Sequence, residues 1–276
     1  MKQRLLVAAI GVPLLIVVLV ILPPAATAIL TAAIAGAAAY ELLHTAARQP
    51  GRLYGMTILT AAALVLFLAQ YSSTQQSWLL RAGAAYAFLY LMYLFLAAVA
   101  THGKDNAVPF SDVAVCIVAA FVFPAMYSFL ALLRNLSPIF VLMPFVVAFI
   151  GDSFSMLGGM AFGHKKFAPH VSPNKTWAGF IAGPIGSALG MVLLGLAARW
   201  IWHASLPLWY LALIGVVANL FGQLGDLSTS LIKREAGIKD YSHIFLTHGG
   251  VLDRFDSVLF VAPVVYAMLL VMEAVL

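Results

Sequence analysis

Charged side chains are scarce in this sequence. Only 9% of its 276 residues are Asp, Glu, Lys or Arg, whereas 63% are hydrophobic. A soluble domain carries about 25% charged residues, so the composition excludes an ordinary soluble protein. The mean hydropathy is +1.01, and apolar runs recur along the whole chain, which predicts an all-α, polytopic integral membrane protein. A membrane β-barrel would alternate polar and apolar residues, and these runs are continuous.

Several other features are missing. The single cysteine, Cys116, lies in an apolar run, so an intramolecular disulfide is excluded. The histidines lack zinc-site spacing and have no cysteine partners, and no G-x-x-x-x-G-K-[ST] loop is present to indicate a P-loop. The net charge of +5 is typical of a membrane protein with basic cytoplasmic loops, so we expect no nucleic acid as a partner.

The apolar runs predict about nine transmembrane helices in a single membrane domain, residues 1–276. Each run is close to the ~20 residues that cross a bilayer, although the third is short. Residues 1–135 form N-terminal helices with few polar residues, and residues 136–276 carry most of the polar detail. The predicted spans are residues 5–22, 24–43, 55–70, 78–99, 112–133, 139–162, 179–202, 208–226 and 257–276.

The basic side chains are distributed unevenly between the two sides of these spans. With the N-terminus inside, twelve of the 15 Lys and Arg residues fall on the cytoplasmic side, and only Arg81, Arg134 and Arg199 fall outside. The positive-inside rule therefore predicts a cytoplasmic N-terminus. This topology places residues 163–178 and 230–256 on the same cytoplasmic side.

Charge is concentrated in residues 230–256, which hold eight of the 25 charged side chains. Asp253 and Asp256 are three residues apart, so both carboxylates can point the same way from a helix. The preceding His248-Gly249-Gly250 allows a tight turn and a close approach of the backbone to a ligand, because glycine has no side chain. This arrangement indicates a binding site.

Two further acids lie in or beside apolar runs. Asp152 lies within a run, where a carboxylate costs at least ~2.5–3.5 kcal/mol, so it must face a polar interior or a partner; the alternative is a hydrogen-bonded packing residue. Asp226 ends the eighth span, and if the helix continues, Asp226, Ser230 and Arg234 share one face. For Lys233 and Arg234 the alternative is a helix end whose basic side chains snorkel to lipid headgroups.

Acidic and basic side chains that lie together at one membrane face suggest a binding site for a polyanion, in which a divalent metal ion links the acids to the polyanion. Mg²⁺ prefers carboxylate oxygens, phosphate oxygens and water, and lysine and arginine neutralise the remaining phosphate charge. The basic residues on this side are Lys165, Lys166, Lys175, Lys233, Arg234 and Lys239.

Residues 230–256 resemble the signature of the phosphatidate cytidylyltransferase (CDP-diacylglycerol synthase) family. The matching residues are Ser230, Lys233-Arg234, Lys239-Asp240, His248-Gly249-Gly250, Asp253-Arg254 and Asp256. The resemblance runs nearly end to end, because further similar motifs occur outside the signature. These are Arg4, Glu41-Leu42, Ser172-Pro173-Asn174-Lys175-Thr176-Trp177 and Gly225-Asp226-Leu227.

The chain departs from the family pattern at four positions. Leu246 stands where the family usually has Pro, Gly or Ser, and Ala178 follows Trp177 where it usually has Glu. Met160 replaces a usual Arg, and Ser153 a usual Thr. None of these changes affects Asp226, Asp253 or Asp256.

The resemblance implies that CTP and phosphatidate give CDP-diacylglycerol and pyrophosphate, in a catalytic half, residues 136–276, with its site at the cytoplasmic face. The attacking phosphate oxygen is already anionic, so catalysis rests on positioning and electrostatics. We assign Asp226, Asp253 and Asp256 as ligands of Mg²⁺, with up to two metal ions. The expected catalytic residues are Ser230, Lys233, Arg234, Lys239, Asp240, His248 and Arg254. The expected substrate-binding residues are Asp152, Ser172, Asn174, Lys175, Gly249 and Gly250.

The resemblance also implies the partners: CTP, phosphatidate, the bilayer and a second copy in a homodimer. We expect the inner membrane of a bacterium, with the active site facing the cytoplasm. A CTP-dependent polyprenol kinase and a cytidylyltransferase for another lipid phosphate remain open, although His248-Gly249-Gly250 favours the diacylglycerol enzyme. An ion-coupled transporter using Asp152 as a relay is less favoured, because the polar residues crowd one face and no repeat is visible.

Overall fold

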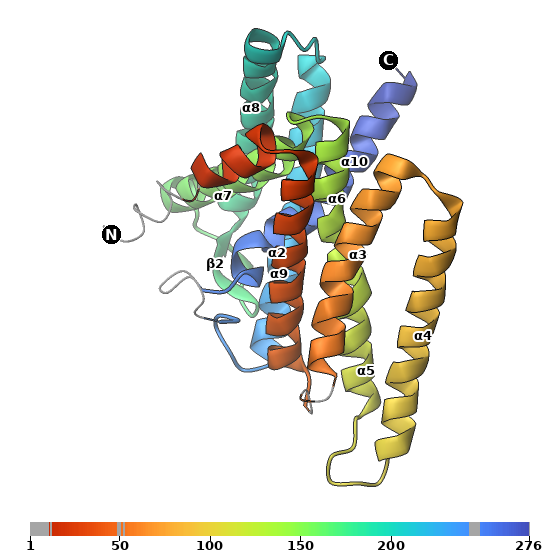
Figure 1. Ribbon diagram of the computed structural model, residues 1–276. Coiled ribbons are helices and arrows are strands. Elements are labelled where there is room, and N and C mark those ends of the chain that lie inside the picture. Colours follow the sequence, from red (N-terminus) through yellow and green to blue (C-terminus); the bar gives the residue numbers. More distant parts are fainter. Residues whose placement is uncertain (1–10, 12, 49–50, 52, 243–248, 276) are drawn as a thin grey trace. The chain divides into compact units, whose positions relative to one another are not determined.

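Helices dominate the computed structural model, which describes residues 11, 13–48, 51, 53–242 and 249–275 (Figure 1). The described helices are η1 (Val17–Ile21), α2 (Pro24–Ala46), α3 (Tyr54–Thr74), α4 (Ser77–Thr101), α5 (Phe110–Ile117), η3 (Val118–Val122), α6 (Phe123–Leu136), η4 (Phe140–Leu142), α7 (Met143–Phe162), α8 (Trp177–Trp202), α9 (Leu208–Glu235) and α10 (Leu252–Val275). The strands are β1 (Lys166–Ala168) and β2 (Ser172–Thr176).

Eight helices of the described residues are long and apolar enough to cross a membrane. They correspond to eight of the nine predicted spans, so the expected all-α, polytopic membrane class is confirmed and the chain is an integral membrane protein. The remaining predicted span, residues 5–22, lies partly outside the described residues. The hairpin of β1 and β2 is a small addition to the expected class.

The helices extend beyond the apolar runs that predicted them. The third span has 21 residues in α3 instead of the short run 55–70. Helix α9 continues past residue 226 to Glu235, and α10 begins at Leu252 rather than at residue 257. Hydropathy marks only the part of a helix that lies in lipid, whereas backbone hydrogen bonds continue into the polar segments.

The chain forms two compact units. Unit 1 comprises residues 1–135 and 240–253, and unit 2 comprises residues 136–239 and 254–276. In unit 1, α2 packs against α3 through small side chains, and Ala35, Ala38 and Ala39 are at most 1% exposed. Small residues let membrane helices approach closely, because lipid provides no hydrophobic force between them.

Polar side chains complete the packing of unit 1. The Thr57 and Tyr90 hydroxyls are 2.7 Å apart and join α3 to α4. The backbone amide of Arg48, in the connection that follows α2, donates to both carboxylate oxygens of Asp112, at 3.0 and 3.1 Å. The Arg134 guanidinium donates to the Leu22 carbonyl at 2.9 Å, just beyond η1. Such bonds satisfy backbone groups for which lipid offers no partner.

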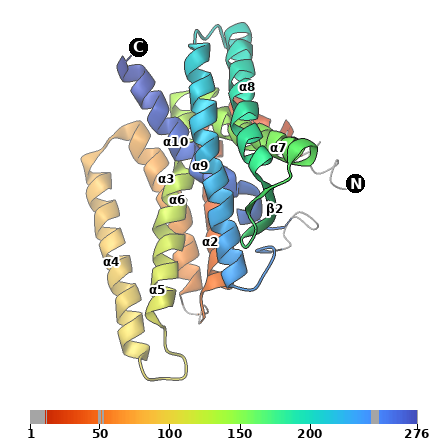
Figure 2. The same ribbon diagram turned by 180° about the vertical axis from the view of Figure 1, so that it is seen from behind.

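In unit 2, α8 packs against both α7 and α9, and Figure 2 shows α8 and α9 side by side. The close packing requires glycine: a Cβ added to Gly215 of α9 would be 2.6 Å from the Ser187 carbonyl of α8. Buried amides reinforce it, because Gln223 Nε2 donates to the Phe180 carbonyl at 3.1 Å and to Asn219 Oδ1 at 2.8 Å.

The hairpin that connects α7 to α8 has antiparallel strands, with Lys166 opposite Thr176 and Ala168 opposite Ser172. Its second strand leads directly into α8, where Thr176 Oγ1 accepts the Gly179 amide at 3.2 Å and caps the helix. The Phe167 ring stacks on Phe180 with centroids 4.5 Å apart. These contacts fix β2, which carries three of the expected substrate-binding residues, Ser172, Asn174 and Lys175.

Candidate active site

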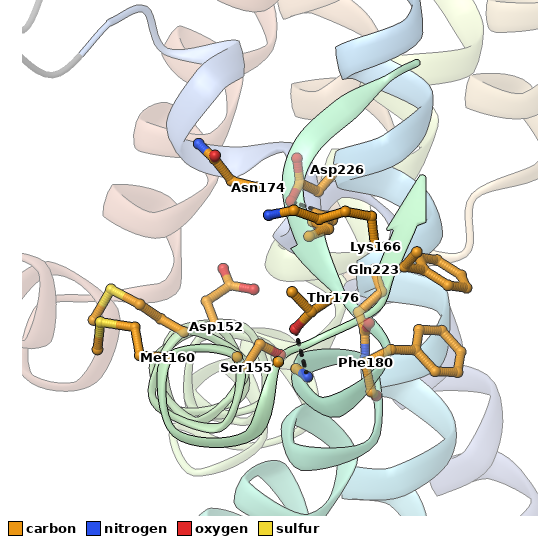
Figure 3. Close-up of a pocket in the computed structure, with 15 residues that line it drawn as sticks. Asp152, Ser155, Met160, Lys166, Asn174, Thr176, Phe180, Gln223 and Asp226 are labelled. Atoms are coloured by element: carbon orange, nitrogen blue, oxygen red, sulfur yellow. Dashed lines mark hydrogen bonds and ion pairs between the residues drawn. The ribbon is translucent and has the colours of Figure 1, made fainter. Parts of the chain in front are cut away.

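A pocket of about 500 Å³ lies in unit 2, among α7, the hairpin, α8 and α9 (Figure 3). Its charged lining comes from Asp152 of α7, Lys166 of β1, Lys175 of β2 and Asp226 of α9. Uncharged polar side chains add to it: Ser155, Asn174, Thr176 and Gln223. The remaining wall is largely apolar and includes Met156, Met160, Phe167 and Phe180. A largely apolar wall with a few convergent polar groups is typical of a ligand site.

Asp226 forms an ion pair at the pocket wall. Lys175 Nζ lies 2.6 Å from Asp226 Oδ2, and the two side chains are 24% and 30% exposed. Ser230 Oγ donates to Asp226 Oδ1 at 3.3 Å, one helical turn further along α9. The continuation of α9 confirms that Asp226, Ser230 and Arg234 follow one another on one helix. The structure therefore brings together residues that the sequence predicts as a metal ligand, a catalytic residue and a substrate-binding residue: Asp226, Ser230 and Lys175.

Asp152 presents its carboxylate to the same pocket. The residue is exposed, and no described residue donates a hydrogen bond to it. Figure 3 shows Asp152 on α7 with its carboxylate pointing away from the helix, below Asp226 of α9. A packing residue would be enclosed and hydrogen-bonded, so the geometry favours a ligand-facing role.

Asp256 lies in the first part of α10 and is almost enclosed, with 9% of its surface exposed. Thr229 Oγ1 of α9 donates to Asp256 Oδ2 at 3.4 Å. Gly225 of α9 lies against the same residue, since a Cβ there would be 2.8 Å from the Asp256 carbonyl oxygen. The α9 residues on either side of Asp226 therefore contact Asp256, which places both acids in one region of unit 2.

Asp253 belongs to unit 1, and its carboxylate is hydrogen-bonded to the backbone. Asp253 Oδ2 accepts the Tyr241 amide at 2.8 Å and the Gly250 amide at 2.9 Å. Gly249 has a φ of +78°, in the left-handed region that favours glycine. The sequence predicted that the two glycines let the backbone approach a ligand closely. Among the described residues, the groups that approach this backbone are carboxylates of this chain.

The expected catalytic residues after Ser230 lie in varied surroundings. Lys233 is buried, with 8% exposed. Arg234 donates to the Val171 carbonyl at 3.3 Å and to the Ile238 carbonyl at 3.1 Å, so it ties the hairpin to the end of α9. Lys239, Asp240 and Arg254 are exposed, and Ser172 begins β2 outside the pocket lining. His248, like Arg4 and Leu246, lies outside the described residues.

The profile of the Cytidylyltransferase family matches residues 2–272. The chain belongs to this family. It is 31% identical over 272 residues to the phosphatidate cytidylyltransferase of Bacillus subtilis, covering 98% of this chain and 97% of the relative. The protein of that name in Staphylococcus haemolyticus is 32% identical over 215 residues, 76% of this chain and 78% of the relative. These findings confirm the resemblance and, with it, the enzyme class of a nucleotidyltransferase.

Several pocket residues of this cytidylyltransferase escaped the sequence reasoning. Phe180 and Gln223 line the pocket and belong to no predicted motif, whereas Thr176 lies in the motif of residues 172–177 but has no predicted role. Gln223 is 8% exposed in an apolar helix, and a buried polar residue in a membrane span is the signal that singled out Asp152. The aromatic residues gave no such signal, because 12% of the chain is aromatic and most of those side chains simply face lipid or the core.

The donor set fits a metal ion that is completed by its substrate. Among the described residues, no group of three or more His, Cys, Asp and Glu side chains is placed to hold a metal ion. However, the Lys175 ammonium lies 2.6 Å from Asp226, so this carboxylate already accommodates a cation. Mg²⁺ commonly takes only one or two protein carboxylates and obtains its other oxygens from water and substrate phosphates.

Proposed function

We propose that this cytidylyltransferase transfers CMP from CTP to phosphatidate and releases pyrophosphate. The observation that carries the proposal is the pocket, which presents Asp152, Lys175 and Asp226 among membrane-spanning helices. A site that joins a charged nucleotide to a membrane lipid needs such a combination. The similarity to proteins named phosphatidate cytidylyltransferase, over 98% of this chain in one case, supports the same reaction.

In the proposed reaction, a phosphate oxygen of phosphatidate attacks the α-phosphorus of CTP. A new P–O bond forms there, the bond to the β-phosphate oxygen breaks, and pyrophosphate leaves. The attacking oxygen carries no proton, so no general base is needed, and the difficulty is the repulsion between two anions. Lys175 and Lys166 of the hairpin both line the pocket, which supports a role in neutralising phosphate charge as the two substrates meet.

We assign the metal to Asp226, Asp253 and Asp256 and expect Mg²⁺, with up to two ions. When bound, a divalent metal would neutralise the phosphate oxygens and stabilise the leaving pyrophosphate. Asp253 and Asp256 lie one turn apart in α10, and backbone amides orient the Asp253 carboxylate. Ligating carboxylates are themselves commonly held by hydrogen bonds, which supports the assignment of Asp253.

The experiment is a product assay with the purified chain in nanodiscs, with CTP, phosphatidate and Mg²⁺. We expect CDP-diacylglycerol and pyrophosphate in equal amounts, and none when the metal is chelated. A CTP-dependent kinase would release CDP instead, so finding CDP without pyrophosphate would contradict the proposal. A panel of lipid phosphates, including a polyprenyl phosphate, identifies the acceptor.

The orientation is also a proposal: a cytoplasmic N-terminus, a cytoplasmic active site and the inner membrane of a bacterium. It is supported by the distribution of Lys and Arg, twelve against three. His170 is exposed in the turn of the hairpin, so a cysteine there, in a Cys116→Ser background, should react only from the cytoplasmic side. Labelling from the outside alone would reverse the topology. The homodimer remains a prediction.

A further inference from the structure

Glu41 is a fully buried acid in the C-terminal part of α2, with 0% of its surface exposed. Its carboxylate accepts three hydrogen bonds: from Ser242 Oγ at 2.5 Å, from the Val251 amide at 2.9 Å and from the Leu252 amide at 2.7 Å. The donors lie 201 to 211 residues later in the sequence. One side chain of unit 1 thus holds both described ends of the segment 242–252.

These bonds place the carboxylate at the start of α10. Leu252 is the first residue of the helix, and the first amides of a helix have no acceptor within it. A negative charge there also interacts favourably with the helix dipole. Glu41 therefore acts as an N-terminal cap supplied by another helix, a role that a neighbouring side chain usually fills.

Gly250 completes the contact, because it leaves room for the carboxylate. A Cβ at this position would be 2.7 Å from Glu41 Oε2, closer than side-chain atoms approach one another. The same Gly250 donates its amide to Asp253 Oδ2 at 2.9 Å. Two carboxylates therefore accept hydrogen bonds from the same short stretch of backbone. Glu41 comes from the N-terminal part of the sequence, and Asp253 from the helix that follows the stretch.

A buried carboxylate is costly unless hydrogen bonds compensate for its lost hydration. An apolar side chain at position 41 would fill the space in α2 without that cost. The acid at position 41 is therefore explained by the hydrogen bonds that it accepts from the backbone leading to Asp253. Because Asp253 is one residue beyond Leu252, a shift of the first turn of α10 would move its carboxylate directly.

We propose that Glu41 is a positioning residue for the cytidylyltransferase reaction. It fixes the first turn of α10 and thereby the direction in which Asp253 presents its carboxylate. The inference rests on the proposed function, in which Asp253 is a metal ligand. Glu41 itself touches neither the substrates nor the metal.

The chain offers a matched control. Asp112 is another buried acid of unit 1, 1% exposed, whose carboxylate accepts a backbone amide, that of Arg48. It holds the connection after α2 and not the segment before α10. Comparing Glu41→Gln with Asp112→Asn therefore distinguishes two effects. One is the general effect of losing a buried carboxylate that accepts backbone amides, and the other is the specific effect of losing the carboxylate at the start of α10.

The test measures hydrogen exchange and kinetics on the full chain in nanodiscs, at a temperature where all variants are folded. In Glu41→Gln we expect the Val251 and Leu252 amides to exchange at least about tenfold faster, because their charged acceptor is gone. We expect kcat to fall about 10- to 100-fold, with the KM for CTP nearly unchanged, since no substrate contact is lost. Asp112→Asn should alter neither these amides nor kcat.

Ser242→Ala provides a second, milder variant if Glu41→Gln does not fold. It removes one of the three donors, so kcat and exchange should change in the same direction by a smaller factor. The inference is wrong if Glu41→Gln lowers thermal stability while kcat and the exchange of these amides stay at wild-type values. If wild type forms no CDP-diacylglycerol, the proposed function fails instead, and unchanged exchange in Glu41→Gln would separately disprove the anchoring.

Discussion

Glu41 in unit 1 and Asp152 in unit 2 are both carboxylates within apolar helices, yet their surroundings are opposite. Glu41 is 0% exposed and accepts three hydrogen bonds from its own chain. Asp152 is exposed to a pocket and receives no hydrogen bond from any described residue. The hydrogen-bonding capacity of Glu41 is met by the protein itself, whereas that of Asp152 is available to a ligand that enters the pocket.

The comparison shows that an acid in a membrane span indicates a polar partner without indicating which kind. The partner of Glu41 is the backbone at the start of α10, so its role is architectural. Asp152 and Asp226 face a pocket together with Lys175, which suits a charged ligand. The predictions below test this division, from the largest expected effect to the smallest.

Removing the charge of a proposed metal ligand should have the largest effect. We expect Asp226→Asn and Asp256→Asn each to slow CDP-diacylglycerol formation by about 10²- to 10³-fold, comparable to the loss of one transition-state contact. The control is Asp105→Asn, an exposed acid in the connection between α4 and α5, which should leave the rate unchanged. A near-normal rate in either variant would remove that acid from the proposed metal site.

The two contrasted acids should differ in their contribution to stability. In Glu41→Ala two backbone amides and one hydroxyl lose their acceptor, and each unsatisfied group costs about 1–3 kcal/mol, so the free energy of unfolding should fall by at least about 3 kcal/mol. Asp152→Ala should change it by no more than about 0.5 kcal/mol, because no packed contact is lost. Thermal unfolding in detergent measures both, and equal losses would contradict the division.

Lys175 should compete with the metal for Asp226. Its ammonium lies 2.6 Å from the carboxylate, so in Lys175→Met the nucleotide-free protein should bind Mn²⁺ about tenfold more tightly, measured by electron paramagnetic resonance. Turnover should nevertheless fall by about tenfold or more, because a phosphate ligand is lost. Lys166→Met is the matched control: Lys166 lines the same pocket, but no described acid lies within ion-pair distance. Unchanged Mn²⁺ binding in Lys175→Met would disprove the competition.

Ala178→Glu should have the smallest effect. Position 178 lies in the first turn of α8, where an acid is tolerated by the helix dipole, and the proposed metal ligands Asp226, Asp253 and Asp256 are unchanged. We expect wild type and Ala178→Glu to form CDP-diacylglycerol at rates within about tenfold of each other. If only the variant is active on a panel of lipid phosphates, the chain has lost the activity of its family and the proposed function is wrong.

The sequence predicted the membrane class and nine spans, eight of which correspond to described helices, because an apolar run of about 20 residues has few alternatives to a spanning helix. It also selected Asp152, Lys175 and Asp226, since polar residues in or beside such runs are rare. It did not predict that Lys175 would pair with Asp226, because a lysine in a strand and an aspartate in a helix share no periodicity. Hydropathy did not determine whether α9 extends to Glu235, because the apolar run ends where the lipid ends.

Sequence alone therefore determined which segments span the membrane, which family the chain resembles and which acids are candidates for a functional site. Only the tertiary structure decided what each acid meets. Glu41 shows why: its partners lie 201 to 211 residues away, and no local pattern records a hydrogen bond between such distant residues. Composition and spacing act over a few helical turns, whereas burial, ion pairing and the orientation of a carboxylate depend on which helices pack together.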